Sequence, residues 1–266
     1  MNIDQTEMLR METDYFLFEE VLWGTLAYEL YLEFRYEIFC KELRRVVPPP
    51  SLLSSRPMET DQYDVCSRHF IAYHKTTSSI AASARVILPS PIGLNVTPRY
   101  IIDRPLPYPD ATDDNIGEIS RMAIAPQFRR RHEDQNKPFQ GGPESEMSFQ
   151  QEKRRRHQPE LVLGMYREIY QMSKQQGVSY CMAAMDDRFS RLLNTLGFPF
   201  KAVGPVNKNV QPPRRVYLIS AVELERSLNS REARILSFLQ AKVTGNPDAC
   251  PGTPSPAGCK SGNLKK

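Results

Sequence analysis

The apolar residues near the N-terminus form one stripe at helical spacing. Its members recur every four residues at Leu22, Leu26, Leu30, Phe34 and Ile38. This spacing keeps side chains near one face of an α-helix. Thr25 is a residue type that caps helix N-termini, and Pro48–Pro50 cannot continue a helix. The pattern predicts a helix over about residues 25–45, with this stripe as its apolar face.

Seven further segments are rich in apolar residues and are bounded by turn residues, which is typical of β-strands. They are residues 14–19, 67–74, about 80–88, 117–125, 178–185, 200–205 and 214–220. A short polar run separates the second of these segments from the third, which predicts a β-hairpin.

Three helices are expected in the C-terminal half, at about residues 159–176, 187–196 and 221–242. The first has its apolar residues at Leu161, Met165, Ile169 and Met172, and Gly177 follows its end. Strands and helices mix along the chain, and hairpins dominate its first half. The sequence therefore predicts one α/β (α+β) domain over residues 14–242, a mixed sheet with helices on its faces.

Two segments have the composition of flexible chain. Residues 127–158 hold basic runs, a Gly141-Gly142 pair and few aromatic residues, which predicts a flexible insertion. Residues 243–266 are rich in Pro and Gly, which predicts a disordered tail. Residues 1–13 are polar and expected to be loose, and residues 89–116 read as a loop with at most a short helix.

Composition, charge and residue spacing exclude several classes of protein. The 266 residues carry a net charge of +4 and are 40% hydrophobic, which is ordinary for a globular protein. No apolar run is long enough to span a membrane, and the N-terminus lacks the apolar region of a secretory signal, so a cytoplasmic protein is expected. The five cysteines form no CxxC pair, and no histidine has metal-ligand spacing, so neither a disulfide scaffold nor a metal site is predicted. The mild charge does not indicate a nucleic-acid binder.

Four short motifs contain candidate chemistry. They are Arg35-x3-Phe39, Asp61-x2-Asp64, Arg85 in a strand, and Glu118-Ile-Ser-Arg121. Each has an ordinary alternative: packing and surface charge for the first, a local turn for the aspartates, a solvated surface charge for Arg85, and a structural ion pair for Glu118. Glu118 and Arg121 are three residues apart in a predicted strand, so regular alternation places them on opposite faces unless a bulge intervenes.

Taken together, in this order and spacing, these motifs resemble the acyl-homoserine-lactone (autoinducer) synthases. More closely, the chain resembles the PEP-CTERM/exosortase-system-associated acyltransferases, which are similar to the N-acyl amino acid synthases. All are divergent members of the GNAT acyltransferase superfamily. The resemblance covers about residues 14–220 and includes the later segments Gly177-Val178, Leu196-Gly197-Phe198 and Val203-Gly204-Pro205.

The resemblance implies a twisted mixed sheet that splays open in its middle, where the thioester arm of an acyl donor enters. Backbone amides of the central strand would bind that arm, here at Met122, Ala123 and Ile124. The resemblance also implies a site for a cationic amine acceptor, with Glu118 as the base that takes the proton of the attacking amine. The implied substrate-binding residues are Arg35, Phe39, Asp61, Asp64, Arg85 and Arg121.

The implied function is transfer of a fatty-acyl group from acyl carrier protein, or from acyl-CoA, to an amino-acid-like amine, with no tightly bound cofactor. Arg129, Arg130 and Arg131 follow the central strand where the superfamily has a glycine-rich pyrophosphate loop. That replacement favours an acidic acyl carrier protein as donor and partner. Two alternatives stay open: lactone synthesis from S-adenosylmethionine, although no Trp follows Phe39 within residues 40–47, and a non-catalytic binding module that uses the basic loop.

Overall fold

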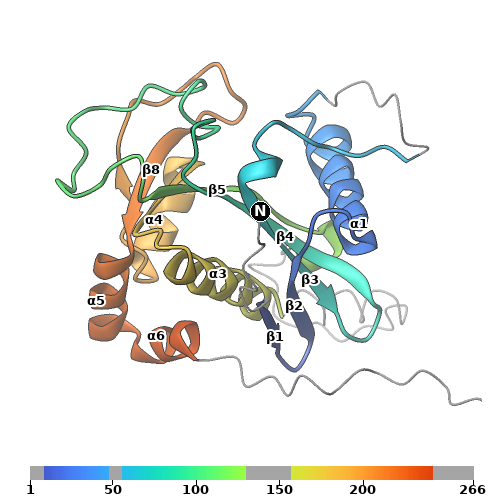
Figure 1. Ribbon diagram of the computed structural model, residues 1–266. Coiled ribbons are helices and arrows are strands. Elements are labelled where there is room, and N and C mark those ends of the chain that lie inside the picture. The colour runs from blue at the N-terminus through green and yellow to red at the C-terminus, as the bar shows by residue number, and fades with distance from the viewer. Residues whose placement is uncertain (1–8, 48–55, 130–156, 242–266) are drawn as a thin grey trace, which may run out of the picture.

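The computed structural model describes residues 9–47, 56–129 and 157–241 (Figure 1). Its centre is an eight-stranded sheet in the order β1-β2-β3-β4-β5-β6-β8-β7. The strands are β1 (Arg10–Glu12), β2 (Phe16–Val21), β3 (Ser67–His74), β4 (Ser79–Ile87), β5 (Ile116–Ile124), β6 (Tyr180–Met185), β7 (Lys201–Ala202) and β8 (Arg215–Ser220). All neighbouring strands are antiparallel except β5 and β6, which are parallel. The predicted mixed sheet is confirmed.

The predicted strands lie within a few residues of the observed ones, and the β3–β4 hairpin is confirmed. The expectation of loose chain over residues 1–13 is wrong for β1, which pairs with β2. This three-residue edge strand is too short and polar to show an apolar pattern. Residues 88–115 form neither helix nor strand, as expected.

The helix predicted over residues 25–45 has two parts. Its start is confirmed, since the Thr25 hydroxyl accepts a hydrogen bond from the Tyr28 N–H at 3.2 Å and caps α1 (Leu26–Arg35). The chain then continues as a π-helix over Tyr36–Glu42. The predicted stripe is not the buried face. Repeats of four exceed the 3.6 residues of a helical turn, so the stripe winds round the helix and leaves its first members exposed.

Helices cover both faces of the sheet (Figure 1). On one face, α3 (Gln158–Gln175) packs over a core that includes Phe16, Phe18 and Phe70. On the same face, α4 (Asp187–Thr195), α5 (Ala221–Arg231) and α6 (Ala233–Gln240) cover β6 and β8. On the other face lie α1 and the loop of residues 88–115. The helix predicted over 221–242 is therefore two helices, separated at Glu232.

Close approach of α3 to the sheet depends on one glycine. A Cβ atom at Gly164 would lie 2.1 Å from the Cζ atom of Phe18. Because that distance is far inside van der Waals contact, only glycine fits between this turn of α3 and the ring. Gly164 thus sets the spacing of the largest core.

The sheet opens between β5 and β6. The two strands pair only at Ile116–Tyr180, Gly117–Cys181 and Glu118–Met182. Beyond Glu118, β5 pairs only with β4, and beyond Met182, β6 pairs only with β8. The rest of β5 therefore presents an unpaired edge to the space between the strands, as the resemblance implies.

Most of the predicted insertion and all of the predicted tail lie outside the described residues. Of the insertion, the described parts are a short 3-10 helix at Pro126–Phe128, Arg129, and the start of α3 with the residue before it. Within the described ranges, no helix is long and apolar enough to cross a membrane.

Candidate active site

A bulge in β5 brings the Glu118-Ile-Ser-Arg121 motif to one face of the sheet. The register runs from Arg85–Ser120 to Ser83–Ala123, so β5 has one residue more than β4 at this point. Arg121 is in the left-handed region with a φ of 48°. Because the extra residue interrupts the alternation, Arg121 joins Glu118 and Ser120 on the face that carries α1 and the 88–115 loop.

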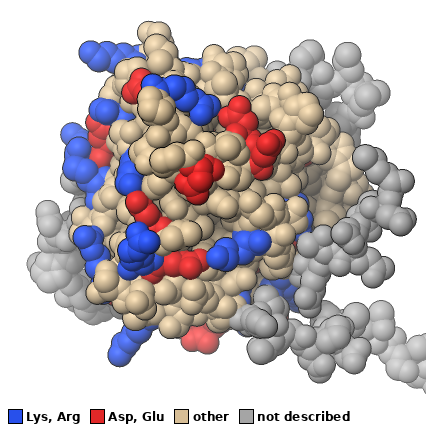
Figure 2. Space-filling model, turned by 60° about the vertical axis from the view of Figure 1, so that its left-hand side comes forward, with Lys and Arg blue, Asp and Glu red and all other residues tan. Residues whose placement is uncertain are grey.

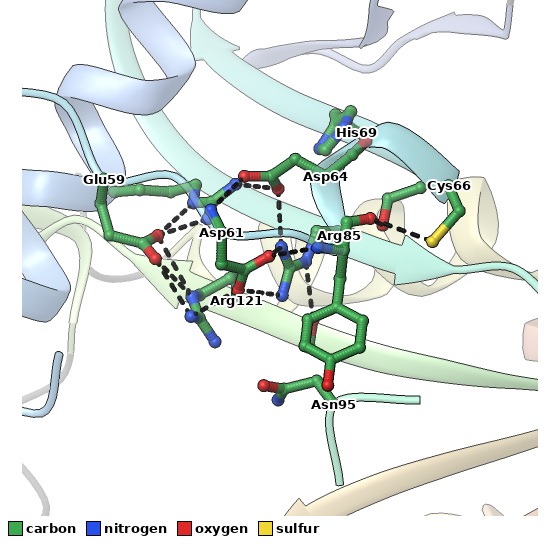
Figure 3. Close-up of polar contacts among 12 residues, drawn as sticks. Glu59, Asp61, Asp64, Cys66, His69, Arg85, Asn95 and Arg121 are labelled. Carbon is green, nitrogen blue, oxygen red and sulfur yellow. Dashed lines mark hydrogen bonds and ion pairs between the residues drawn. The ribbon is translucent and has the colours of Figure 1, made fainter. Parts of the chain in front are cut away.

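Six charged side chains form an ionic cluster on this face (Figure 3). They are Arg35, Arg85, Arg121, Glu59, Asp61 and Asp64. Arg85 binds Asp61 with a fork, through Nη1 to Oδ1 at 2.6 Å and Nη2 to Oδ2 at 3.0 Å. Its Nη1 also lies 2.6 Å from Asp64 Oδ1, and its Nε donates to Ser120 Oγ at 3.0 Å. Such paired contacts fix both position and orientation.

The other two arginines complete the cluster. Arg35, at the end of α1, donates from Nε to Glu59 Oε2 at 2.5 Å and from Nη1 to Asp64 Oδ1 at 2.7 Å. Arg121 donates to Glu59 through Nε at 3.1 Å and Nη2 at 3.0 Å. Three cations thus meet three carboxylates, so the charges balance.

The pKa values follow from this balance. Burial by itself raises the pKa of Asp64, but the charges of Arg35 and Arg85 outweigh it and hold that pKa at about 2. Burial opposes ionisation of Asp61 as well, and its bonds to Arg85 nevertheless lower its pKa. Both aspartates are therefore anionic at neutral pH.

The cluster reaches solvent at Asp61. The side chain of Asp61 is 19% exposed, whereas those of Glu59 and Asp64 are 0% and 1% exposed. Phe39, on the π-helix, lies under the Arg121 guanidinium at 5.6 Å. An incoming cation can therefore contact the cluster through the Asp61 carboxylate alone.

Glu118 lies outside the cluster, and its hydrogen-bond partners are uncharged. Its Oε1 accepts from Asn95 Nδ2 at 3.1 Å, and its Oε2 accepts from the Val96 N–H at 2.8 Å. The side chain is buried, and burial raises its pKa despite these two hydrogen bonds and the charges of Arg85 and Arg121. A carboxylate with a raised pKa is a better proton acceptor, which suits the predicted role of a base.

The backbone beyond the bulge defines the open edge. The Ala125 N–H donates to the Ala81 carbonyl at 2.8 Å, and Ile124 lies opposite Ala82. Since bonded and non-bonded pairs alternate in an antiparallel ladder, Ile124 directs its N–H and carbonyl away from β4, whereas Ala123 is paired with Ser83. Of the three predicted donor-binding residues, Ile124 therefore faces the opening and Ala123 does not.

The structure places Arg129 at the end of β5. Its Nε donates to the Ile124 carbonyl at 2.6 Å, and its other nitrogens pair with the Glu42 carboxylate. Arg129 therefore links the π-helix to the end of β5, and its predicted role in donor binding stays a prediction. Arg130 and Arg131 lie outside the described residues.

The sequence interpretation missed several site residues. Glu59 binds two arginines, and its signal was available, because three clustered arginines need a third carboxylate. Ser120 and Asn95 gave no signal. His69 links the Asp64 backbone to α1, with Nδ1 3.2 Å from Tyr31 Oη and Nε2 3.2 Å from the Asp64 carbonyl. Burial lowers the His69 pKa to about 4, so its ring is neutral. No group of potential metal ligands occurs in the described part of the chain.

Comparisons with known sequences and structures identify proteins similar to this chain. Residues 34–135 match the sequence family described as an acetyltransferase (GNAT) domain. No curated protein sequence is significantly similar to the chain.

Solved structures with the same fold are similar at low sequence identity. TofI, in a ternary complex with an inhibitor and MTA, is 15% identical with a TM-score of 0.53, over 81% of this chain and 96% of that one. The AHL synthase LasI is 16% identical with a TM-score of 0.52, over 81% and 95%. FeeM, an N-acyl amino acid synthase from uncultured soil microbes, is 9% identical with a TM-score of 0.46, over 80% and 94%, a likeness too weak for further argument.

The matched region contains the whole ionic cluster and the bulged strand. The predicted fold class and the predicted enzyme class, an acyltransferase, are therefore confirmed. The chain has a GNAT-like acyltransferase fold, and its residues 34–135 are similar to the GNAT acetyltransferase domain family.

Proposed function

We propose that this protein transfers a fatty-acyl group from a thioester donor to the amine of an amino-acid-like acceptor. The observation that supports this best is the buried Glu118 carboxylate, at the last residue of β5 that pairs with β6. A base therefore stands where the free edge of β5 begins. Acyl transfer to an amine needs a base for the amine proton and, beside it, backbone groups that bind the thioester donor.

The acceptor amine binds between Asp61 and Glu118. Asp61 is the exposed carboxylate of the cluster and attracts the ammonium form. The arginines that hold Asp61 keep its pKa low, so it stays anionic and does not take the proton. Glu118, whose pKa is raised, takes one proton from the bound ammonium, and the neutral amine then attacks.

In the transfer, the amine nitrogen bonds to the acyl carbon and the carbon–sulfur bond breaks. The second proton of the nitrogen passes to the thiolate, which leaves as the free thiol. The thioester arm lies along the open edge of β5, where the Ile124 N–H is directed into the opening. Acyl carrier protein is the donor that we propose, with acyl-CoA as the alternative.

Two other functions are kept as alternatives. The first is lactone synthesis from S-adenosylmethionine, a cation that Asp61 also suits. The second is a binding module that uses the basic loop, most of which lies outside the described residues. On the face that bears α4 and α5, basic and acidic side chains are interspersed and form no extended basic field among the described residues (Figure 2). Association with a PEP-CTERM/exosortase system and a cytoplasmic location stay predictions.

The proposed function is tested with defined thioesters. Purified protein is incubated with acyl-CoA or acyl carrier protein charged with fatty acids, and with a panel of amino acids or S-adenosylmethionine. Free thiol and products are then measured by a thiol reagent and mass spectrometry. N-acyl amino acids with matching thiol release support the proposal, and acyl lactones support the first alternative. No thiol release from any pair contradicts both.

A further inference from the structure

The Asn95 side chain lies against the Glu118 carboxylate. Its Nδ2 donates to Glu118 Oε1 at 3.1 Å, and the N–H of the next residue, Val96, donates to Glu118 Oε2 at 2.8 Å. Asn95 and Glu118 are both buried. Figure 3 shows that Asn95 comes from a different segment from those that carry the ionic cluster. The 88–115 loop therefore supplies both of these hydrogen bonds to the base.

The loop holds these two groups in place. Val96 packs in a buried core that includes Met182, and Met182 lies opposite Glu118 where β5 and β6 pair. The Val96 carbonyl accepts from the Tyr100 N–H at 2.9 Å. Because the backbone around Asn95 is fixed in this way, the orientation of the Asn95 amide is the part that can change.

The Asn95 amide is hydrogen-bonded at one end only. Its Oδ1 is buried without a hydrogen-bond partner among the described residues. Asn115 and Asn207, by contrast, use both ends: each donates from Nδ2 to a backbone carbonyl and accepts at Oδ1 from a backbone N–H. Half a turn of an amide exchanges an oxygen for a nitrogen in almost the same place. At Asn95, the bond to Glu118 is the hydrogen bond that decides which of the two atoms faces the carboxylate.

Glu118 changes its hydrogen-bonding character when it takes a proton. An ionised carboxylate only accepts hydrogen bonds, whereas a protonated carboxyl group also donates one. Asn95 Nδ2 suits the first state, and Asn95 Oδ1 suits the second. The Val96 N–H can only donate, so Glu118 Oε2 keeps the same partner in both states. Oε1 is therefore the atom whose partner can follow the proton.

We propose that Asn95 is a positioning residue that turns its amide when Glu118 takes a proton from the acceptor. The inference rests on the proposed function and deepens it, because it assigns the place of the transferred proton. An N–H bond of the bound ammonium breaks, its electron pair stays on the nitrogen, and the proton forms the Oε1–H bond of Glu118. That O–H then donates to Asn95 Oδ1 and not back to the nitrogen. The electron pair of the nitrogen is thereby free to attack the acyl carbon.

The groups around Glu118 set the pH at which it ionises. Burial is the largest influence and raises its pKa, whereas the charges of Arg85 on β4 and Arg121 on β5 lower it. Tyr100 on the loop also interacts with Glu118 electrostatically, and the β6 residue paired with Glu118 is uncharged. The hydrogen bond from Asn95 acts in the same direction as the arginines and lowers the Glu118 pKa. Removal of that bond should therefore raise it.

The test measures kcat against pH, with thioester and amine both saturating, in three variants. Asn95→Leu is close in size and removes both hydrogen-bonding ends, and Asn95→Asp keeps the shape but places a second carboxyl group against Glu118. The matched control is Asn207→Leu, because the Asn207 amide holds the same loop at the Arg99 carbonyl.

The variant at position 95 that lacks both ends should show the effect most simply. We expect Asn95→Leu to lower kcat roughly tenfold or more and to move the acidic limb upward by roughly one pH unit, since a hydrogen bond to a charged group is lost. Asn95→Asp should move the limb further, because two adjacent carboxyl groups resist double ionisation. Asn207→Leu should leave the limb in place and change kcat little. A limb that stays at the wild-type pH in both Asn95 variants, or one that moves equally in Asn207→Leu, would overturn the positioning role.

NMR separates this inference from the proposed function, because it needs no turnover. The carbon signal of the Glu118 carboxyl group is assigned by its absence from Glu118→Gln, and the amide signal of Asn95 by its absence from Asn95→Leu. In the wild type the two signals should titrate with the same midpoint, and the Asn95 shift should vanish in Glu118→Gln. An Asn95 signal that does not follow Glu118 contradicts the turning amide even if acyl transfer is observed. Signals that titrate together in a protein without transferase activity would support the turning amide and contradict the proposed function alone.

Discussion

Arg121 binds Glu59 through two of its nitrogens while its own backbone occupies the left-handed region, with a φ of 48°. A side chain other than glycine costs about 1 kcal/mol or more in that conformation. The contacts between Arg121 and Glu59 therefore compensate for the cost of the left-handed backbone in the bulge. Without it, Arg121 would point to the α3 face, and Glu59 would lose one of its two arginines.

This relationship leads to a comparison of two substitutions at one position. Arg121→Ala and Arg121→Gly both remove the ion pairs, but only glycine adopts the left-handed conformation freely. We expect both variants to be less stable than the wild type, and the glycine variant to be more stable than the alanine variant by about 1 kcal/mol. Urea denaturation measures the difference. An alanine variant that equals or exceeds the glycine variant would show that the bulge stores no strain.

Removal of the Arg35 side chain from the ionic cluster should lower the stability of the protein strongly. Arg35→Ala leaves Glu59 and Asp64 buried without one of their cations, which typically costs roughly 3–5 kcal/mol. The matched control is Lys41→Ala in the adjoining π-helix, where the partner Glu37 is exposed and the loss of stability should be small. Denaturant midpoints of the two variants should differ clearly. Similar midpoints would mean that the cluster contributes little to stability.

The sequence predicted the order of strands and helices, because each has a clear apolar pattern or a capping residue such as Thr25. It missed β1, the π-helix and the break at Glu232. Each of these is fixed by pairing or packing with distant segments and not by local propensity.

The site could be predicted only in part, because distant segments also decide its geometry. The charged residues could be singled out, but the bulge that unites Glu118 with Arg121 depends on the register with β4 and leaves no mark in the sequence. The ion pair of Arg129 depends on Glu42, which is distant in the sequence and close only in the fold.

The close contact between Gly164 and Phe18 predicts that a larger residue at position 164 destabilises the core. Gly164→Ala improves helix propensity by about 1 kcal/mol, but its Cβ would overlap the Phe18 ring. We expect a net destabilisation of about 1–3 kcal/mol. Combining it with Phe18→Leu should cost less than the sum of the two single changes, because the smaller side chain makes room for the methyl group. Additive costs in a double-mutant cycle would refute the steric explanation.

The buried Glu168 side chain on α3 should make the stability of the protein depend on pH. Burial raises its pKa to about 7, against the lowering effect of Arg167, 2.9 Å away. The folded state then keeps a proton that the unfolded state releases near pH 4.3, so stability falls as pH rises between these values. From pH 5 to pH 8, the wild type should lose about 1–3 kcal/mol more than Glu168→Gln does. Identical pH slopes for the two proteins would place Glu168 at an ordinary pKa.

The central claim, that Glu118 accepts the proton of an attacking amine, is tested most directly by thiol release from a saturating acyl thioester as a function of pH. Glu118→Gln should fold normally, because the Asn95 Oδ1 atom, buried without a hydrogen-bond partner among the described residues, can accept from the new amide after a flip of the Asn95 side chain. At neutral pH its kcat should fall by roughly 10²–10⁴. The wild type should lose activity as pH falls through the raised pKa of Glu118, and the variant should lack this limb. A variant that melts like the wild type, turns over within a few-fold of it and keeps the acidic limb would contradict the claim.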